Sequence, residues 1–515
     1  MQEPAQNLPS ASSGSHHLSA RSLILLLGLT LVAIAIMGYH PGLEDDSFYL
    51  AAIKRHLNPG LFPHDSDFFR VQFQATIFDK LIAWSARLIP LSLPWVILLW
   101  QFAAVFLVLL CCYQISQRCF RRPESHWASV SLVAALLSMP LPGIALLLGD
   151  QYLHPRMLAT AAILNAIVAV IDRRPWLCGI LLLIAFSIHA IAACFGISFC
   201  VFLAWELRRT PKPMPSPVVV AVSLLLPFGW LFEPASDAWR QAAATRGFFH
   251  LRSWHWYEWL GVVAPLLLLF LFHRVLERRT FAVEGTALRP VTASVVYYGV
   301  FQTVAGLMIM LPSSLERLRP FEPMRYLHLL YLLFFIIGGG LCGAYILQRR
   351  LFRWLLLFLP MSAGMFYWQR EMYSASPHLE MPFLAPRSAW LRSFEWIRTH
   401  VPVDSYFALD PHYETLPGED YHGFRALAER SVLADYDKDA GMVVRVPSLA
   451  PRWLKEVTAL SGWRTFRSQD FERLKRDFGV NWIVLSRSDQ EFSSPDSSIM
   501  ICPYSNEDVK VCRIL

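Results

Sequence analysis

Basic residues occupy every second gap between the hydrophobic runs of this chain, and this alternation constrains the fold most strongly. The basic gaps read RCFRR at 118–122, DRRP at 172–175, RRTPKP at 208–213, RVLERR at 274–279 and QRRLFR at 348–353. The gaps between them are mixed and carry the acidic residues. Short cytoplasmic loops of membrane proteins retain Lys and Arg. The pattern therefore predicts a polytopic membrane protein whose acidic gaps lie outside the cytoplasm.

The composition agrees with a membrane domain that carries a soluble part. The chain is 55% hydrophobic, and 17% of its residues are charged, against about a quarter in an average soluble protein. Most of the net charge of +7 lies in the short basic gaps, where it sets orientation. The predicted partner is therefore the lipid bilayer, and no nucleic-acid partner is predicted.

Runs of about 20 apolar residues indicate membrane-spanning helices. Such runs lie near 21–38, 92–113, 128–148, 157–171, 217–233, 260–273, 291–311, 327–347 and 354–368. The long run at 176–206 has basic clusters at both ends, so it must cross the membrane an even number of times. It is predicted to form two short helices that meet near 187–189, with His189 toward the outer face. The sum is about eleven spans, with the amino terminus cytoplasmic and the carboxy terminus outside.

The predicted fold class is mainly α: a polytopic transmembrane helical bundle with a small α/β extracytoplasmic carboxy-terminal domain. Residues 1–20 form a disordered tail by composition, 21–368 the transmembrane domain, and 369–515 the soluble domain. The first outer loop, 39–90, is long. Its segment 46–57 has an apolar stripe at helical spacing and is predicted to lie along the membrane surface.

The tail alternates short helical and strand patterns, which indicates an α/β domain. Helices are predicted near 387–400, 421–430, 450–461 and 468–478, and strands near 405–409, 431–435, 481–486, 498–503 and 509–514. The last two strands form a predicted hairpin with Cys502 nearly opposite Cys512. A disulfide between them is expected in an oxidising compartment. The alternative is two small hydrophobic strand residues.

Three segments at the outer ends of spans combine charged residues that suit chemistry. The first holds Glu44, Asp45 and Asp46, directly after the first span. One of these carboxylates could accept a proton from an acceptor hydroxyl as general base. Two could share a divalent metal such as Mg or Mn, because hard cations take carboxylate oxygens. The alternative is a helix cap with solvated charge.

The second segment, 149–159, holds Asp150, His154 and Arg156 at the outer end of the third span. An unpaired Arg at membrane depth is costly, so Arg156 should pair with Asp150 or with a lipid phosphate. The alternative is a snorkelling side chain that anchors the helix.

The third segment, 313–330, places Arg325 at the start of a span. Arg can hold phosphate in a fork of hydrogen bonds, so Arg325 is the candidate for a lipid-linked phosphate or diphosphate. The alternative is ion pairing with Glu316 and Glu322. His189 is a further candidate, or else a hydrogen-bonded structural group at a helix end.

This layout resembles the GT-C superfamily of membrane glycosyltransferases. The likeness rests on the acidic residues at 44–46 after the first span, on Asp150 near the outer end of the third, and on the soluble carboxy-terminal domain. The stretches HPGLEDDSFYLAAIKRHLNPGLFPHD at 40–65 and DQYLHPR at 150–156 also resemble a group of uncharacterised bacterial polytopic membrane proteins. The tail resembles the same group through FRALAERSVLADYDKD at 424–439 and ICPYSNEDVKVCRIL at 501–515.

The resemblance implies transfer of a sugar from a polyprenyl-phosphate carrier to an acceptor on the outer face of a bacterial inner (plasma) membrane. Asp45 or Asp46 would be the general base or a metal ligand, and Asp150 the second acidic group, with Asp46 and Asp150 the pair for a metal. Arg156 or Arg325 would hold the carrier phosphate. The remaining substrate-binding candidates are Glu44, His154 and His189. The first loop reads E-D-D rather than D-x-D, and the absence of a W-W-D-type motif from the tail argues against transfer to asparagine.

Two other classes of function compete with this one. A non-catalytic scaffold, or a subunit of cell-envelope polysaccharide assembly, would keep the architecture and bind a protein partner through 370–515. A transporter is disfavoured, because the sequence has no internal repeat and no pair of Gly/Pro-broken spans at matching positions.

Overall fold

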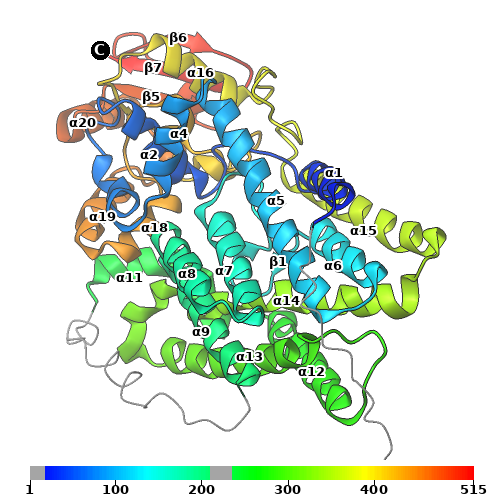
Figure 1. The fold of residues 1–515 in the computed structure, drawn as a ribbon. Helices are drawn as coiled ribbons and strands as arrows, with labels where there is room; N and C mark the ends of the chain where they lie inside the picture. The colour runs from blue at the N-terminus through cyan, green and yellow to red at the C-terminus, as the bar shows by residue number, and fades with distance from the viewer. Residues whose placement is uncertain (1–17, 209–234) are drawn as a thin grey trace, which may run out of the picture.

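Long apolar helices dominate the structure, a computed structural model that describes residues 18–208 and 235–515. Seven described helices are long and apolar enough to cross a membrane. They are α1 (Ala20–Met37), α5 (Leu93–Cys119), α9 (Ala190–Leu207), α12 (Trp256–Arg278), α13 (Leu288–Met310), α14 (Tyr326–Cys342) and α15 (Leu351–Met372). A small sheet with its own helices follows near the carboxy terminus (Figure 1). The predicted fold class, a mainly α bundle with a small α/β part, is confirmed.

Three shorter helices complete the described part of the bundle. They are α6 (Pro123–Ala135), α7 (Pro155–Ile171) and α8 (Pro175–Ile188). The predicted hairpin within 176–206 is present, because α8 ends and α9 begins on either side of His189. The predicted spans correspond to these ten helices and to 217–233, which lies outside the described residues.

The predicted helix at 128–148 is wrong beyond Ala135, where α6 ends. The chain continues as an irregular loop in which β1 (Pro140–Leu141) pairs antiparallel with β2 (Leu146–Leu147). Pro140 and Pro142 cannot continue a helix. Gly143 has a φ of +70°, and a Cβ there would lie 2.6 Å from ring atoms of Trp254. These residues turn the chain back, and the loop then leads to Asp150.

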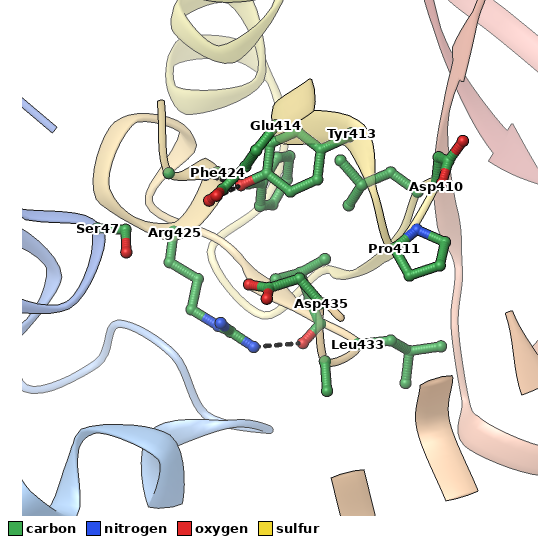
Figure 2. Close-up of a pocket in the computed structure, with 13 residues that line it drawn as sticks. Ser47, Asp410, Pro411, Tyr413, Glu414, Phe424, Arg425, Leu433 and Asp435 are labelled. Atoms are coloured by element: carbon green, nitrogen blue, oxygen red, sulfur yellow. Dashed lines mark hydrogen bonds between the residues drawn. The ribbon is translucent and has the colours of Figure 1, made fainter. Parts of the chain in front are cut away.

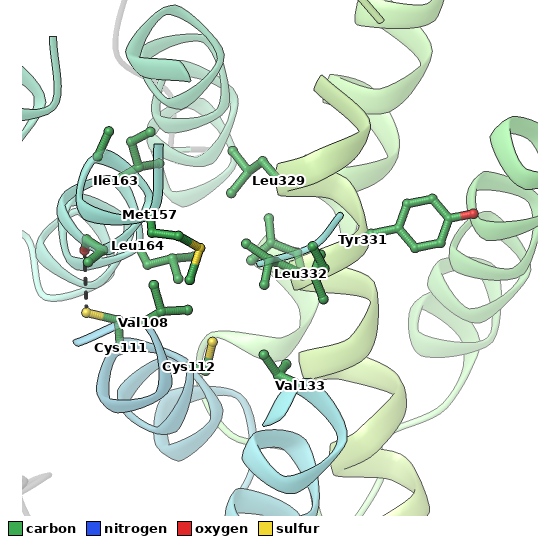
Figure 3. Packing of buried hydrophobic residues seen from close by; sticks show 14 of the residues in the cluster. Val108, Cys111, Cys112, Val133, Met157, Ile163, Leu164, Leu329, Tyr331 and Leu332 are labelled. Carbon is green, nitrogen blue, oxygen red and sulfur yellow. Dashed lines mark hydrogen bonds between the residues drawn. The ribbon is translucent and has the colours of Figure 1, made fainter. Parts of the chain in front are cut away.

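The core of the bundle lies where α5, α6, α7 and α14 meet (Figure 3). Val108, Leu164 and Leu332 come from three of these helices and are buried. The adjacent Cys111 and Cys112 are also buried, and the Cys111 thiol donates to the Ala161 carbonyl at 3.5 Å. Both cysteines therefore serve packing.

The basic gaps at 118–122, 172–175 and 348–353 come together at one end of the bundle. Arg118 pairs with Asp172 at 2.5 Å, and Arg349 pairs with Glu124 at 2.6 Å. The backbone at Phe120 forms a bridge with Glu284. The ends of α5 and α7 and the starts of α6, α13 and α15 therefore share a face. At the opposite end of the bundle, the segment after α1 reaches the carboxy-terminal unit (389–515), where Leu43 forms a bridge with His422.

The carboxy-terminal unit is built on a five-stranded sheet of order β4-β3-β5-β7-β6. Its strands are β3 (Tyr406–Ala408), β4 (Ser431–Val432), β5 (Trp482–Ser486), β6 (Met500–Ser505) and β7 (Val509–Ile514). The first three pair in parallel, and β6 and β7 add antiparallel. Each lies within or beside a predicted strand. A disulfide joins Cys502 to Cys512 across the closing hairpin.

Helices flank this sheet, four of them at predicted positions. These are α16 (Ala389–His400), α17 (Phe424–Ala428), α19 (Ala450–Ala459) and α20 (Ser468–Phe478). A further helix, α18 (Lys438–Arg445), was not predicted. Its sequence begins within the charged run DYDKD at 435–439, which by itself suggests a solvated turn. Tertiary contacts decide otherwise, because Asp439 and Met442 on this helix are buried.

The first outer loop contributes α2 (Asp46–Leu57), η1 (Ser66–Phe69), α3 (Arg70–Ala75) and α4 (Phe78–Leu88). The prediction that the first of these lies on the membrane surface is wrong. Its apolar stripe, including Phe48, Ala51 and Ile53, is buried, and α17 and α4 contact the helix. An amphipathic stripe shows which face is buried but does not show whether lipid or protein covers it.

A buried ionic cluster ties this loop to the carboxy-terminal unit. Arg425 on α17 donates to Asp65 of the loop at 2.5 Å and to both carboxylate oxygens of Asp439 at 2.9 Å. Figure 2 shows Arg425 reaching the Val432 carbonyl, with Ser47 of α2 nearby. The loop and the carboxy-terminal unit are therefore packed as one body above the helix ends.

Candidate functional site

A cavity of about 310 Å³ lies where the first outer loop, the β1–β2 loop, the end of α15 and α18 meet. The charged residues that line it are Glu44, Asp45, Asp150, Arg156, Arg246, Arg325 and Lys438. Acidic groups from two separate turns and the candidate arginines thus face one space. Its wall also includes Trp368 and Tyr373 near the end of α15.

Asp150 and Arg156 form a buried ion pair at the cavity wall. Arg156 donates from Nη2 to Asp150 Oδ1, and each residue is 4% exposed. The Asp150 carbonyl accepts a hydrogen bond from Gln101 at 2.7 Å, which holds the turn in place. Within the described residues, Arg156 Nε and Nη1 have no hydrogen-bond partner. The pair therefore keeps spare donors beside the cavity.

His154 lies between the two acidic turns. Its Nδ1 accepts the Arg156 backbone N–H at 2.9 Å. A neutral ring in this arrangement carries its proton on Nε2, which faces Asp45 Oδ2 at 3.9 Å. The ring also contacts Tyr49 and His189, with centroids 5.0 and 6.0 Å apart. His154 is 2% exposed, so it is placed to orient Asp45 rather than to meet solvent.

Asp45 is the most exposed of the three carboxylates that line the cavity. Its side chain is 40% exposed. Burial of the group opposes ionisation, but the neighbouring His154 ring and the nearby charges of Lys438 and Arg445 outweigh it and hold the pKa of Asp45 well below its ordinary value. The side chain is therefore an ionised acceptor that faces the cavity.

Asp46 does not join the cavity, contrary to its predicted place beside Asp45. It is 2% exposed, and its Oδ2 accepts the Gly42 N–H at 2.6 Å. Burial raises the pKa of Asp46 to about 7. Because α2 begins at this residue, successive side chains point in different directions. Glu44 points elsewhere again and forms an ion pair with Lys438.

The predicted metal pair, Asp46 and Asp150, does not fit a shared Mg or Mn ion. Asp46 faces the Gly42 backbone, while Asp150 is held by Arg156. Across 18–208 and 235–515, no three His, Cys, Asp or Glu side chains converge as a metal site would require. One oxygen of each carboxylate, Asp46 Oδ2 and Asp150 Oδ1, is therefore already committed to another partner.

Arg325 forms one of the two predicted ion pairs and also lines the cavity. Its partner is Glu322, which also accepts Arg445 at 3.2 Å. Glu316, the other predicted partner, pairs instead with Arg240 at 3.0 Å.

A second, apolar cavity of about 30 Å³ lies among α7, α9 and α14. Its walls include Ile163, Phe195 and Leu329. Arg156 and Arg325 line both this second cavity, called the apolar slot below, and the larger cavity. His189 lines the slot but not the larger cavity. The two arginines therefore stand between a charged space and an apolar one.

Sequence reasoning missed Arg246, Lys438 and Arg445 as site residues. Lys438 and Glu44 are 394 positions apart, and no periodicity links such distant residues. Arg246 follows α11 (Asp237–Ala244) in an outer loop, where a single arginine carries no motif. The one available signal was the DYDKD run at 435–439, where a lysine stands among acids.

No protein-family model matches this chain, and no curated protein is similar to it. Among solved structures, the chain is similar to the oligosaccharyltransferase of Archaeoglobus fulgidus, determined with a tethered acceptor peptide that contains an NVT sequon. The identity is 13% and the TM-score 0.48, over 91% of this chain and 69% of that one. At this level the similarity concerns only the course of the chain.

Proposed function

We propose that this protein is a membrane glycosyltransferase that moves a sugar from a polyprenyl-phosphate carrier to an acceptor on the outer face of the membrane. The observation that carries the proposal is the shared cavity. In it an ionised, accessible carboxylate stands near several cations, and two of these cations also border an apolar slot in the bundle. A lipid-linked phosphate offers the matching pair of properties: an anionic head and an apolar chain.

The carrier phosphate would bind at Arg156 and Arg325. The unused donors of Arg156 suit phosphate oxygens, which Arg binds through paired hydrogen bonds. The apolar slot beyond these residues, about 30 Å³ in volume, lies on the side where the prenyl chain would leave the phosphate. As the bond from the sugar to the carrier breaks, negative charge develops on the phosphate, and positioned guanidinium groups stabilise it.

Asp45 would act as the general base. The acceptor hydroxyl oxygen would attack the anomeric carbon, its proton would pass to Asp45, and the carrier phosphate would leave with the bonding electron pair. His154 keeps the Asp45 carboxylate ionised and oriented. Such proton transfer contributes about 10²–10⁴-fold to a rate. Asp150 would act through Arg156, by fixing the guanidinium in place.

The charge rule assigns the side of the membrane on which this occurs. The basic gaps at 118–122, 172–175 and 348–353 meet at the end of the bundle opposite the cavity, and such gaps remain in the cytoplasm. The cavity and the carboxy-terminal unit would then lie outside a bacterial inner (plasma) membrane.

Transfer by purified protein in lipid vesicles tests the proposal, with polyprenyl-phosphate sugars and a panel of hydroxyl acceptors. We expect Asp45→Asn to reduce turnover by about 10²-fold or more at unchanged membrane insertion. Asp46→Asn, the matched neighbour outside the cavity, should retain most of the turnover. Full activity of Asp45→Asn would overturn the assignment. Absence of transfer by the wild type, with specific capture of a protein through 370–515, would favour the scaffold instead.

A further inference from the structure

Arg246 is a cation of the cavity without a carboxylate partner. Its Nη2 donates to the carbonyls of Asp437 and Lys438 at the start of α18. Its Nε is buried and has no hydrogen-bond partner in the described parts of the chain, and no ion pair to Arg246 occurs there. The other arginines of this region, Arg156, Arg325 and Arg445, each contact an acidic side chain. A donor left buried and unpaired is costly, so Arg246 is suited to an anion that enters from outside.

Gly441 on α18 leaves the space that the Arg246 guanidinium occupies. A Cβ at this position would lie 3.0 Å from Arg246 Cζ and closer still to Nη2. The guanidinium therefore packs closely against the α18 backbone, which holds it in place through the two hydrogen bonds of Nη2. This is a built position rather than a loose surface side chain.

Lys438 brings a second cation to the same wall. Its side chain is 8% exposed and forms an ion pair with Glu44. Arg246, Lys438, Asp45 and Arg325 all line the larger cavity and also a smaller one of about 40 Å³ beside it. Arg246 comes from the outer loop that follows α11, and Lys438 comes from α18 of the carboxy-terminal unit. Arg156 and Arg325 lie instead at the ends of bundle helices.

We propose that Arg246 and Lys438 form a second anion subsite, adjoining the one at Arg156 and Arg325. This inference rests on the proposed function and adds to it a second negative group on the substrates. The group is an oxyanion: either the second phosphate of a diphosphate-linked donor or the carboxylate of an acidic acceptor sugar. Both offer negatively charged oxygens to the donors of the guanidinium that the backbone does not use.

Calorimetric binding to the full chain in nanodiscs tests the donor source, with farnesyl phosphate and farnesyl diphosphate as probes. We expect the wild type to bind the diphosphate about tenfold more tightly, as one added charge-assisted pair allows. Arg246→Gln should remove this preference and leave the monophosphate affinity unchanged. Gly441→Ala should do the same without removing a charge, because it displaces the guanidinium. Arg240→Gln, at a half-exposed side chain of α11 outside the cavity, is the matched control and should behave as the wild type.

The acceptor source is tested with methyl glucuronide and methyl glucoside. If the carboxylate is the anion, the wild type will prefer the glucuronide, Arg246→Gln will abolish that preference, and the two farnesyl probes will bind alike. The inference is overturned if Arg246→Gln changes neither preference. Failure of the proposed function would look different: the double variant Arg156→Gln/Asp150→Asn would leave the binding of farnesyl phosphate unchanged.

Discussion

At the scale of single residues, three consecutive carboxylates occupy three different environments. Glu44 has a φ of 54° and turns its side chain to Lys438. Asp45 faces the cavity, and Asp46 is enclosed beneath it. The sequence E-D-D therefore supplies one ion-pair partner, one reactive group and one buried acid. The start of α2 separates these roles.

Asp46→Asn should stabilise the protein at alkaline pH. Burial raises the pKa of Asp46 to about 7 from an ordinary 3.8. The folded state therefore holds this proton more tightly, and its stabilising effect is lost as the pH rises from about 4 through about 7. Asparagine has no such loss and can still accept the Gly42 N–H. We expect an advantage on the order of 1–4 kcal/mol at pH 8 that shrinks at pH 5, measured by thermal unfolding in detergent.

Asp45→Asn serves as the opposite case in the same measurement. The pKa of Asp45 is lowered, so its stabilising contribution is present at neutral pH and is lost only as the pH falls below about 4. This variant should be no more stable than the wild type at pH 8. An equal effect of Asp46→Asn at both pH values would contradict the assignment of that residue as a buried acid.

At the scale of elements, close helix contacts depend on small residues in α14. A Cβ at Gly339 would lie 2.8 Å from Ser129 Cα on α6, whereas a Cβ at Gly338 would meet nothing within 4 Å. The neighbouring glycines thus differ completely in what they face. Backbone atoms cannot move aside as a side-chain tip can, so the α6–α14 contact depends on Gly339.

Gly339→Ala should lower stability by about 1–3 kcal/mol through overpacking. Gly338→Ala, its matched control, should be neutral or slightly stabilising, because alanine favours helix. Thermal unfolding of the two variants side by side checks this. Similar melting temperatures for the two variants would mean that α6 and α14 do not approach as closely as described.

At the scale of the whole molecule, the carboxy-terminal unit completes the cavity instead of hanging from the bundle. Besides the Arg425 cluster, Glu380 joins His40 after α1 at 2.7 Å and His422 of the carboxy-terminal unit at 3.0 Å. Burial opposes its charge, but His422 and His40 lower the pKa of Glu380 to about 2. The chain leaves the membrane at α15 and returns to contact the segment that left it at α1.

Cleavage of an engineered protease site in the linker 382–387 should therefore leave the carboxy-terminal unit bound to the membrane part. Arg425→Leu should release it or unfold it, since two buried carboxylates would lose their partner at a cost of about 3–5 kcal/mol. Arg464→Leu, at a side chain 60% exposed, is the control. Size-exclusion chromatography after cleavage reads the outcome. If the cleaved protein that retains Arg425 dissociates, the contact between the carboxy-terminal unit and the membrane part is weak.

Orientation is a further property of the whole molecule. A periplasmic reporter fused after Leu515 should be active, whereas the same reporter inserted after Thr280, beside the RVLERR gap, should be inactive. Matching activity at both positions would contradict the charge rule on which the outer placement of the cavity depends.

Some features of this protein are determined by local sequence alone. Apolar runs of sufficient length and the alternating basic gaps predicted the helical bundle and the break at His189, because hydropathy and loop charge act locally. The strands near the carboxy terminus followed from short β-branched runs between turns. Pro140 and Pro142 indicate the turn after Ala135, but the apolar residues around them suggest a continuing span.

Only the tertiary structure decided which charged residues meet. Asp45 and Asp150 reach one cavity while Asp46 does not, although the sequence offers no reason to separate the two aspartates. Lys438 and Arg246 arrive from elements that are remote in the chain. The tertiary structure also decided that α17, and not lipid, covers α2. Ion pairs form between side chains that are close in space, and proximity between distant segments arises from the packing of whole elements, which no local pattern encodes.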